Sequence, residues 1–242
     1  MEKEGDVAAV IAEPIRWGGY IPPKEYWRRI RQICDEFGAL LIFDEIPFSL
    51  GRTGHGLFAC NFYHESSNDD GISPDVLVLG KGLGGGILPL SAVIMRSEFN
   101  DAIKDIALGH YTHEKNPLLC RAGLATLEFI QTHNLVAHSK TLGDWTLRQC
   151  TTQLSEKYRS IIYDIRGIGL FVCIELRDQH TGDKLSDLTD RVMYECLTRG
   201  LSFKVTNGNV IVLCPPLIVT QEQMQQAIDI IDQSIDKCWQ NH

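Results

Sequence analysis

The 242-residue sequence has no long apolar run, no excess of positive charge and no paired-cysteine motif. No stretch approaches the ~20 consecutive apolar residues that a membrane-spanning helix needs, and the charged start, MEKEGD, lacks the apolar region of a signal peptide. With 23 Lys and Arg against 31 Asp and Glu, the net charge of −8 argues against nucleic acid or an anionic membrane as a partner. These absences predict a soluble, cytoplasmic protein.

The eight cysteines follow no recognisable spacing, and most of them stand inside apolar, periodic segments. Such cysteines are typical of buried, reduced thiols and not of a disulfide framework or a zinc site. The content of 44% apolar and 22% charged residues, without a low-complexity tract, is that of an ordinary globular protein.

Short apolar runs alternate with a helical pattern in the first half of the chain. Strands are expected over residues 7–12, 40–44, 76–79 and 90–95. A helix is expected from Pro22-Pro23 to a stop at Gly38, and the polar residues 65–71 are expected to form an exposed loop. This alternation favours an α/β fold with a mostly parallel sheet, whose strands are buried on both faces.

The pattern changes after residue 134. Asn116-Pro117 first starts a helix that runs to about Thr132, because asparagine is a good N-cap and proline suits the first turn. The second half then predicts helices over 135–158 and 188–199, strand-like runs over 161–176 and 201–217, and a final helix. We therefore expect a sheet domain over residues 1–134 and a smaller α+β domain over residues 135–242.

An aspartate and a lysine stand at the ends of two expected strands. Asp44 ends the run 40–44, and Lys81 follows the run 76–79 inside a glycine-rich segment that lets a bulky ligand approach the backbone. Function gathers at the carboxyl ends of such strands. A lysine there can form a Schiff base with the aldehyde of pyridoxal phosphate, and an aspartate can keep the pyridine nitrogen protonated. The alternative is a solvated charge at each strand end.

The sequence around these two residues resembles that of a known family. Residues 41–54 (LIFDEIPFSLGRTG) and 74–94 (PDVLVLGKGLGGGILPLSAVI) resemble the two central motifs of class-III aminotransferases. The resemblance extends from Ala12-Glu13-Pro14 to Pro215-Pro216-Leu217 and so covers nearly the whole chain. It implies a pyridoxal-phosphate-dependent transferase of fold type I, with part of the large, mostly parallel sheet domain over residues 1–134 and the C-terminal small domain over 135–242.

The same resemblance implies a homodimer with shared active sites and pyridoxal 5′-phosphate as cofactor. The family begins with a further segment of comparable length that carries a small-residue phosphate loop, and no such loop precedes Glu13. We therefore expect this chain to correspond to the C-terminal part of the enzyme.

The resemblance also implies roles for individual residues. Lys81 would hold the cofactor and move the proton, Asp44 would bind the pyridine nitrogen, and Ile46 would pack against the ring, a role that is compatible with a plain core isoleucine. Thr112 would reach the cofactor phosphate of the neighbouring subunit. Glu45 and Arg52 are expected to be structural and to fix a loop as a pair.

Three departures from the family pattern bear on the substrate. Pro47 stands where most relatives have a glutamine that binds the ring hydroxyl, and Val212 stands where the family often has an arginine for the α-carboxylate. The glutamate that partners this arginine is also missing after Glu13-Pro14. Arg16 is then a candidate anion binder, although a plain surface arginine is an equal alternative. Two histidines, His110 and His113, have no third ligand spaced with them, so no metal is expected.

Three functions remain open. The first is an aminotransferase that moves an amino group from a primary amine or amino acid to a 2-oxo acid. The second keeps the same groups but is an ammonia-lyase for a phospho- or phosphonate-bearing amine, a branch that the Ile46-Pro47 pair, the 110–117 loop and Val212 resemble. The third is a catalytically silent fragment or binding module.

Overall fold

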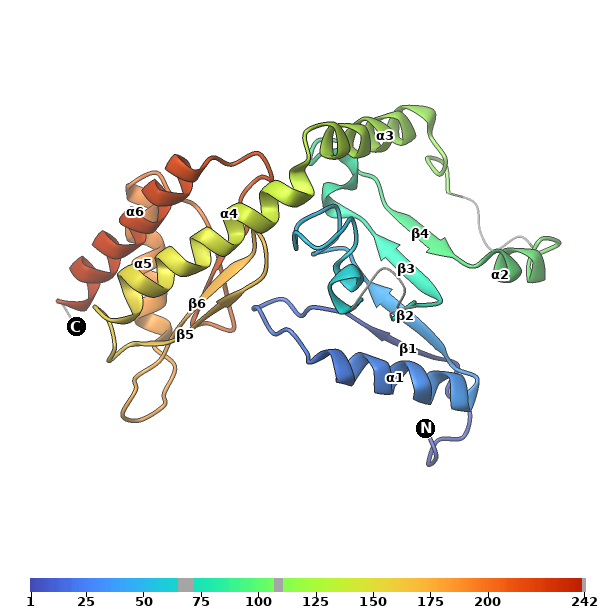
Figure 1. Cartoon of the computed structure of the whole chain (residues 1–242), viewed down its shortest axis with the longest axis horizontal. Helices are drawn as coiled ribbons and strands as arrows, with labels where there is room; N and C mark the ends of the chain where they lie inside the picture. The colour runs from blue at the N-terminus through green and yellow to red at the C-terminus, as the bar shows by residue number, and fades with distance from the viewer. Residues whose placement is uncertain (65–71, 107–110, 241–242) are drawn as a thin grey trace. The chain divides into compact units, whose positions relative to one another are not determined.

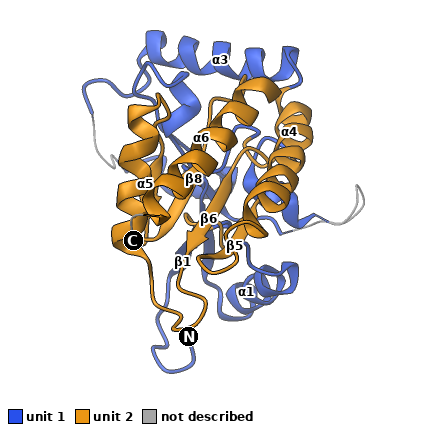
Figure 2. Cartoon of the chain, turned by 90° about the vertical axis from the view of Figure 1, so that its left-hand side faces the viewer, with its two compact units in different colours: residues 1–15, 21–51, 55–134 blue, residues 16–20, 52–54, 135–242 orange. Residues whose placement is uncertain are grey.

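The computed structural model describes residues 1–64, 72–106 and 111–240 (Figure 1). The chain forms two compact units, coloured separately in Figure 2. The first unit contains residues 1–15, 21–51 and 55–134, and the second contains 16–20, 52–54 and 135–242. Two short segments of the N-terminal half thus belong to the second unit, and the domain assignment 1–134 and 135–242 stays a prediction. The loop expected at 65–71 lies outside the described residues, as does His110.

The first unit is built on a four-stranded sheet. Its strands follow the sheet order β1 (Ala9–Ala12), β2 (Leu40–Asp44), β3 (Val76–Leu79) and β4 (Ala92–Met95). The β1–β2 and β2–β3 pairs are parallel, whereas β4 is antiparallel to β3. The sheet is therefore mostly parallel, as predicted, and its last strand turns back because β3 and β4 are joined by a short glycine-rich connection and not by a crossover helix.

Helix α1 (Lys24–Phe37) connects β1 to β2 and covers one face of this sheet (Figure 1). It ends at Gly38, whose φ of 65° is the left-handed conformation that the predicted glycine stop requires. The Trp27 ring meets the ring of Phe43 edge-on at 4.8 Å, and its indole N–H donates to the Pro14 carbonyl at 3.0 Å. Leu41 and Phe43 are fully buried.

Strand β2, in contrast, is fully buried on one face only. Leu40 and Ile42 point to the face opposite Leu41 and Phe43 and stay half-buried, and Ile11 of β1 is 65% exposed. The expectation of two buried faces was therefore wrong for the structure described, because the helix packed on this sheet at β2, α1, covers one side only.

The first unit has further, mostly short helices outside the sheet and α1. These are a 3₁₀ helix at Ala59–Tyr63, a second one at Lys81–Gly84, α2 (Ser97–Ala102) and α3 (Pro117–Thr132). The Asn116 side chain accepts a hydrogen bond from the backbone N–H of Leu118 at 2.9 Å, which confirms the predicted N-cap.

The second unit is a separate α+β layer. An antiparallel sheet with the order β5 (Ile162–Gly167), β6 (Val172–Leu176), β8 (Val210–Leu213) and β7 (Lys204–Thr206) packs against three helices. These are α4 (Leu135–Cys150), α5 (Ser186–Thr198) and α6 (Gln221–Trp239), which lie together over the sheet in Figure 2. Ile174 and Ile211 from the sheet are fully buried with Val192 and Ile228 from the helices. The α4 helix gives way to a π-helical turn after Cys150, earlier than the expected end at 158.

Six of the eight cysteines are buried, Cys120 and Cys214 are exposed, and all eight are free thiols. In the part of the chain that the structure describes, no helix combines the length and the apolar character needed to cross a membrane.

Candidate active site

The pairing of β2 with β3 brings Asp44 and Lys81 to one edge of the sheet. The two strands are parallel, with Asp44 opposite Val78, and the Glu45 N–H donates to the Val78 carbonyl at 3.0 Å. β3 ends at Leu79, and Lys81 opens the 3₁₀ helix two residues later. Asp44 is therefore the last residue of β2, and Lys81 lies just beyond β3, so both stand at the carboxyl ends of neighbouring parallel strands, which is where ligands bind in open α/β sheets.

Asp44 is half-buried and locally fixed. Its Oδ1 atom accepts a hydrogen bond from the backbone N–H of Ile46 at 3.0 Å, the local bond by which aspartate stabilises a turn. Its second oxygen has no hydrogen-bond partner among the described residues. One carboxylate oxygen therefore remains for a ligand.

Lys81 is exposed and has a left-handed backbone, with a φ of 44°. This conformation costs an L-residue roughly 1–2 kcal/mol. Glycine would adopt it without strain, and Gly80 and Gly82 stand on either side. A strained lysine at a strand end, in place of a glycine that would be more stable, is an observation that points to function.

The side chain of Ile46, two residues after Asp44, lies close to the backbone that follows β3. A Cβ atom added at Gly80 would lie 3.5 Å from Cγ1 of Ile46, so the isoleucine side chain rests against the backbone just before Lys81. The structure thus brings Asp44, Ile46 and Lys81 into one neighbourhood, and their roles there stay predictions.

The other predicted residues lie elsewhere. Thr112 and His113 are exposed in the turn before α3. Arg16 is exposed and belongs to the second unit, in the turn 16–20, where its backbone N–H donates to the Tyr20 carbonyl at 3.0 Å. Val212 is 2% exposed. Groups of three or more metal-ligating side chains are not found among the described residues.

Glu45 and Arg52 have different partners, so the predicted pair is wrong. Glu45 is fully buried and accepts hydrogen bonds from the N–H groups of Ala59 and Cys60, at 2.6 and 2.8 Å. Burial raises the pKa of this carboxyl, although these bonds favour its ionised form. Arg52 donates instead to the carbonyl oxygens of Leu170 and Pro215. Each residue is structural, but backbone groups and not an ion pair supply the contacts.

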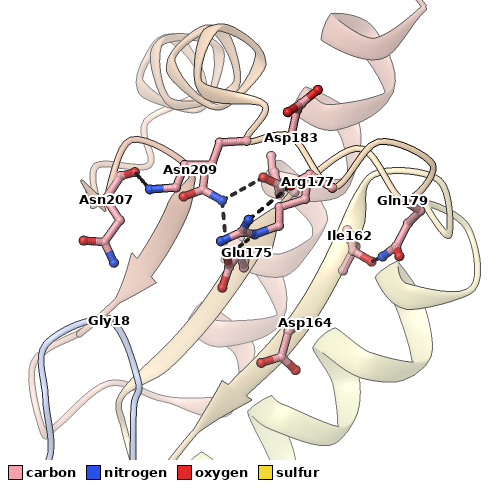
Figure 3. Close-up of polar contacts among 12 residues, drawn as sticks. Gly18, Ile162, Asp164, Glu175, Arg177, Gln179, Asp183, Asn207 and Asn209 are labelled. Atoms are coloured by element: carbon pink, nitrogen blue, oxygen red, sulfur yellow. Dashed lines mark hydrogen bonds and ion pairs between the residues drawn. The ribbon is translucent and has the colours of Figure 1, made fainter.

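The second unit contains a charged cluster that was not predicted from the sequence. Glu175 of β6 is held there by Arg166 and Arg177, and Figure 3 shows it facing Arg177 and Asn209. A signal was present, because Asp164 and Arg166 stand at alternate positions of one strand. Alternate residues share a face of the sheet, so this strand was bound to carry a charged face.

The edge of the first sheet fits pyridoxal phosphate. An amine that can condense with the cofactor's aldehyde, Lys81, and a carboxylate with one unoccupied oxygen, Asp44, stand at neighbouring strand ends. Gly80 and Gly82, on either side of Lys81, carry no Cβ atom that would hinder the approach of a bulky ligand. This donor set is suited to a protonated pyridine ring and not to a metal.

Comparisons with known proteins agree with this geometry. The chain is 43% identical over 240 residues to the (R)-1-hydroxy-2-aminoethylphosphonate ammonia-lyase of Vibrio splendidus, which covers 98% of the chain and 48% of the relative. It is 35% identical to the leucine/methionine racemase of Thermococcus litoralis, over 95% of the chain and 50% of that protein. The chain therefore spans about half the length of these curated relatives.

A solved structure gives the same result for the fold. The amine transaminase of an uncultivated Pseudomonas species, in its PLP-bound form, superposes with a TM-score of 0.85 and 29% identity, over 95% of this chain and 52% of that one. The model of the family described as aminotransferase class-III matches residues 1–235. A match of that extent, with fold type I around the strand-end lysine and aspartate, places the chain in the class-III aminotransferase family, whose cofactor is pyridoxal 5′-phosphate.

Proposed function

We propose that this chain carries the cofactor-anchoring and proton-transfer residues of an enzyme that acts on a primary amine. The observation that supports the proposal most directly is the placement of Asp44 and Lys81 at the carboxyl ends of two paired parallel strands. Ile46 lies against the backbone between them.

The roles follow from the chemistry of each side chain. Lys81 would hold the cofactor through its amine, the free oxygen of Asp44 would bind the protonated ring nitrogen, and Ile46 would pack on the ring. When bound, the cofactor withdraws electrons from the carbon that carries the amino group. The Lys81 amine, once displaced by the substrate, would take up and return the proton of that carbon.

The reaction that we propose is the release of ammonia from a phosphonate-bearing amine. The sequence identity of 43% to a phosphonate ammonia-lyase, over nearly the whole of this chain, supports this choice. So does Val212, a buried aliphatic residue that offers no positive charge to an α-carboxylate. Burying a carboxylate without a cationic partner costs several kcal/mol, so an ordinary α-amino acid would bind poorly at such a position.

Amino-group transfer to a 2-oxo acid is the second candidate. It is supported by the likeness to a PLP-bound amine transaminase at 29% identity. The two reactions differ in what they consume, because elimination needs no amino acceptor.

The experiment adds pyridoxal phosphate to the purified chain and follows visible absorbance, then ammonia. A visible band with ammonia release from 1-hydroxy-2-aminoethylphosphonate, in the absence of any 2-oxo acid, is expected for the lyase. Turnover only when pyruvate or 2-oxoglutarate is present would establish transfer instead. A chain that gives no visible band with the cofactor would be the silent fragment or binding module.

Arg16→Ala is expected to weaken substrate binding more than chemistry. Its exposed guanidinium has no hydrogen bond or ion pair within the described part of the chain. Losing one charge-assisted contact to a phosphonate corresponds to about 1.5–3 kcal/mol, so KM for the amine should rise roughly tenfold or more while kcat changes little. Steady-state kinetics check this, with Arg159→Ala, an exposed arginine of the second unit, as control. Equal kinetics for Arg16→Ala and the parent chain would remove Arg16 from the site.

Thr112 gives a test of shared sites in a homodimer. If its hydroxyl serves the partner's cofactor, mixing Lys81→Ala with Thr112→Ala chains creates dimers in which one site has both residues intact. Random mixing should then restore about a quarter of the sites, since half of the dimers are mixed and each has one intact site. Activity at limiting cofactor is the measurement. Recovery no greater than the sum of the separate variants would show that each site is built within one chain.

A further inference from the structure

The carboxylate of Glu45 lies one residue beyond Asp44, and the proposed chemistry gives it no role. It is fully buried. Its Oε2 atom accepts the Ala59 N–H at 2.6 Å, and its Oε1 atom accepts the Cys60 N–H at 2.8 Å. These two donors begin the 3₁₀ helix Ala59–Tyr63. One carboxylate therefore ties the end of β2 to a helix that starts 14 residues further along the chain.

The helix that Glu45 holds is itself fixed to the rest of the first unit. Tyr63 is fully buried, and its hydroxyl donates to the Pro14 carbonyl at 2.7 Å. The Tyr63 ring also meets the ring of Trp27 on α1, with 6.5 Å between the ring centres. Pro14 follows β1, so the helix is attached at the neighbouring strand as well. Glu45 is thus bonded to anchored structure.

The peptide unit that follows Glu45 connects this anchor to Asp44. The Glu45 carbonyl accepts the N–H groups of Phe48 at 3.2 Å and Ser49 at 3.0 Å. The N–H of the same peptide unit belongs to Ile46 and donates to Oδ1 of Asp44 at 3.0 Å. Because a peptide unit is planar and rigid, its carbonyl and its N–H are fixed together. The orientation of the Asp44 carboxylate therefore depends on how Glu45 is held.

Stability alone does not account for a carboxylate at this position. Taking a charge out of water is costly, and an apolar residue of similar size often stabilises a protein interior more. A glutamine would offer a single oxygen and would turn its NH₂ group toward one of the two backbone donors. Glutamate supplies one acceptor to each donor. This arrangement fixes one geometry of the residues next to Asp44.

We propose that Glu45 is a positioning residue for Asp44: it holds the end of β2 and the following turn so that Asp44 presents its second oxygen to the ring nitrogen of pyridoxal phosphate. All the residues that carry the argument belong to the first unit. The inference rests on the proposed function in one respect, the role of Asp44 toward the ring. The fixing of the Asp44 side chain is independent of that role.

The experiment compares three variants of the full chain. Glu45→Gln removes the charge and one acceptor. Glu45→Asp keeps the charge but is one methylene shorter, which withdraws its oxygens from the two backbone donors, and it decides the question if Glu45→Gln does not fold. Asp75→Asn is the matched control. Asp75 is 4% exposed and accepts the Leu41 N–H at 2.7 Å, but it lies at the amino end of β3.

The first readout is the hydrogen exchange of the Ile46 amide, measured by NMR in the chain without cofactor. This amide donates to Asp44 Oδ1, so its protection reports whether the carboxylate is held in place. Exchange should be about tenfold faster in both Glu45 variants than in Asp75→Asn. The control loses a buried charge from the same unit and therefore shows what lower stability alone does to this amide.

The second readout is a double-mutant cycle in steady-state kinetics with 1-hydroxy-2-aminoethylphosphonate. Glu45→Gln should lower kcat roughly tenfold and change KM little, because a misdirected Asp44 supports the ring less well. In the Asp44→Ala background the same substitution should lower kcat no further, since Glu45 acts through Asp44. A purely structural role would lower kcat by the same factor in both backgrounds.

The outcomes separate the two claims. Equal exchange of the Ile46 amide in the Glu45 variants and in Asp75→Asn would overturn the fixing of Asp44. Faster exchange with independent, additive effects in the cycle would overturn the link to the ring. A parent chain without cofactor absorbance or turnover would instead refute the proposed function, and with it the role of Glu45 toward the ring. The exchange data would still decide whether Glu45 fixes Asp44.

Discussion

Lys81→Ala is expected to abolish turnover and to leave pyridoxal phosphate bound, if at all, without a covalent link. The side chain serves two purposes in the proposed reaction, as the attachment point and as the group that moves the proton. Loss of a positioned acid–base group alone costs about 10²–10⁴ in rate, so the combined loss should exceed a thousandfold. Because alanine accepts the left-handed backbone no more easily than lysine does, the variant changes the amine and not the strain at this position.

The measurement is borohydride reduction of the cofactor-loaded chain followed by peptide mapping, together with kinetics. Lys104→Ala is the control, since Lys104 is an exposed lysine of the same unit. The parent and the control should carry the label on Lys81, and Lys81→Ala should carry none. Label on any other lysine of the parent chain would contradict the assignment of Lys81 as the residue that holds the cofactor.

The strands that frame this lysine could be predicted from the sequence to the residue. Residues 40–44 and 76–79 are short aliphatic runs, and each has a turn residue on at least one side, such as Gly38 or Gly80, that allows few other boundaries. The reversal of β4 was not predicted, because the direction of a strand depends on its connection and not on its own pattern. The exposure of the residues on the strands could not be predicted either, because it depends on which helices pack on the sheet.

The site was predictable where function is local in sequence. Asp44 and Lys81 were each predicted from the short apolar run just before them in the sequence. The parallel pairing of these two strands then brings the residues together. Glu45 and Arg52 could not be assigned correctly, because their partners are backbone groups from 14 to 163 residues away. Residues 16–20 belong to the second unit, where Arg166 donates a hydrogen bond to the Gly18 carbonyl across 148 residues, a contact that carries no local signal.

Asp44 offers the sharpest separation of charge from shape in this site. Its Oδ1 atom fixes the turn through the Ile46 N–H, and its other oxygen is the proposed partner of the ring nitrogen. Asp44→Asn keeps a side-chain oxygen for the turn but loses the negative charge, whereas Asp44→Ala loses both. If the charge sustains the electron-withdrawing ring, both variants should lower kcat by about 10²–10³, the scale on which a preorganised electrostatic partner acts.

Cofactor occupancy should fall much less than kcat in either variant, because the covalent link through Lys81 is unaffected. Absorbance titration with pyridoxal phosphate and steady-state kinetics measure the two quantities side by side, and thermal unfolding reports the turn. Asp44→Ala should also lose about 1 kcal/mol of stability, the typical value of one hydrogen bond, and Asp44→Asn should not. A near-normal rate in Asp44→Asn with a slow Asp44→Ala would mean that Asp44 acts through the turn and not through its charge. The ring nitrogen would then need no anionic partner, and the proton moved by Lys81 would have to be made labile by some other group in the site.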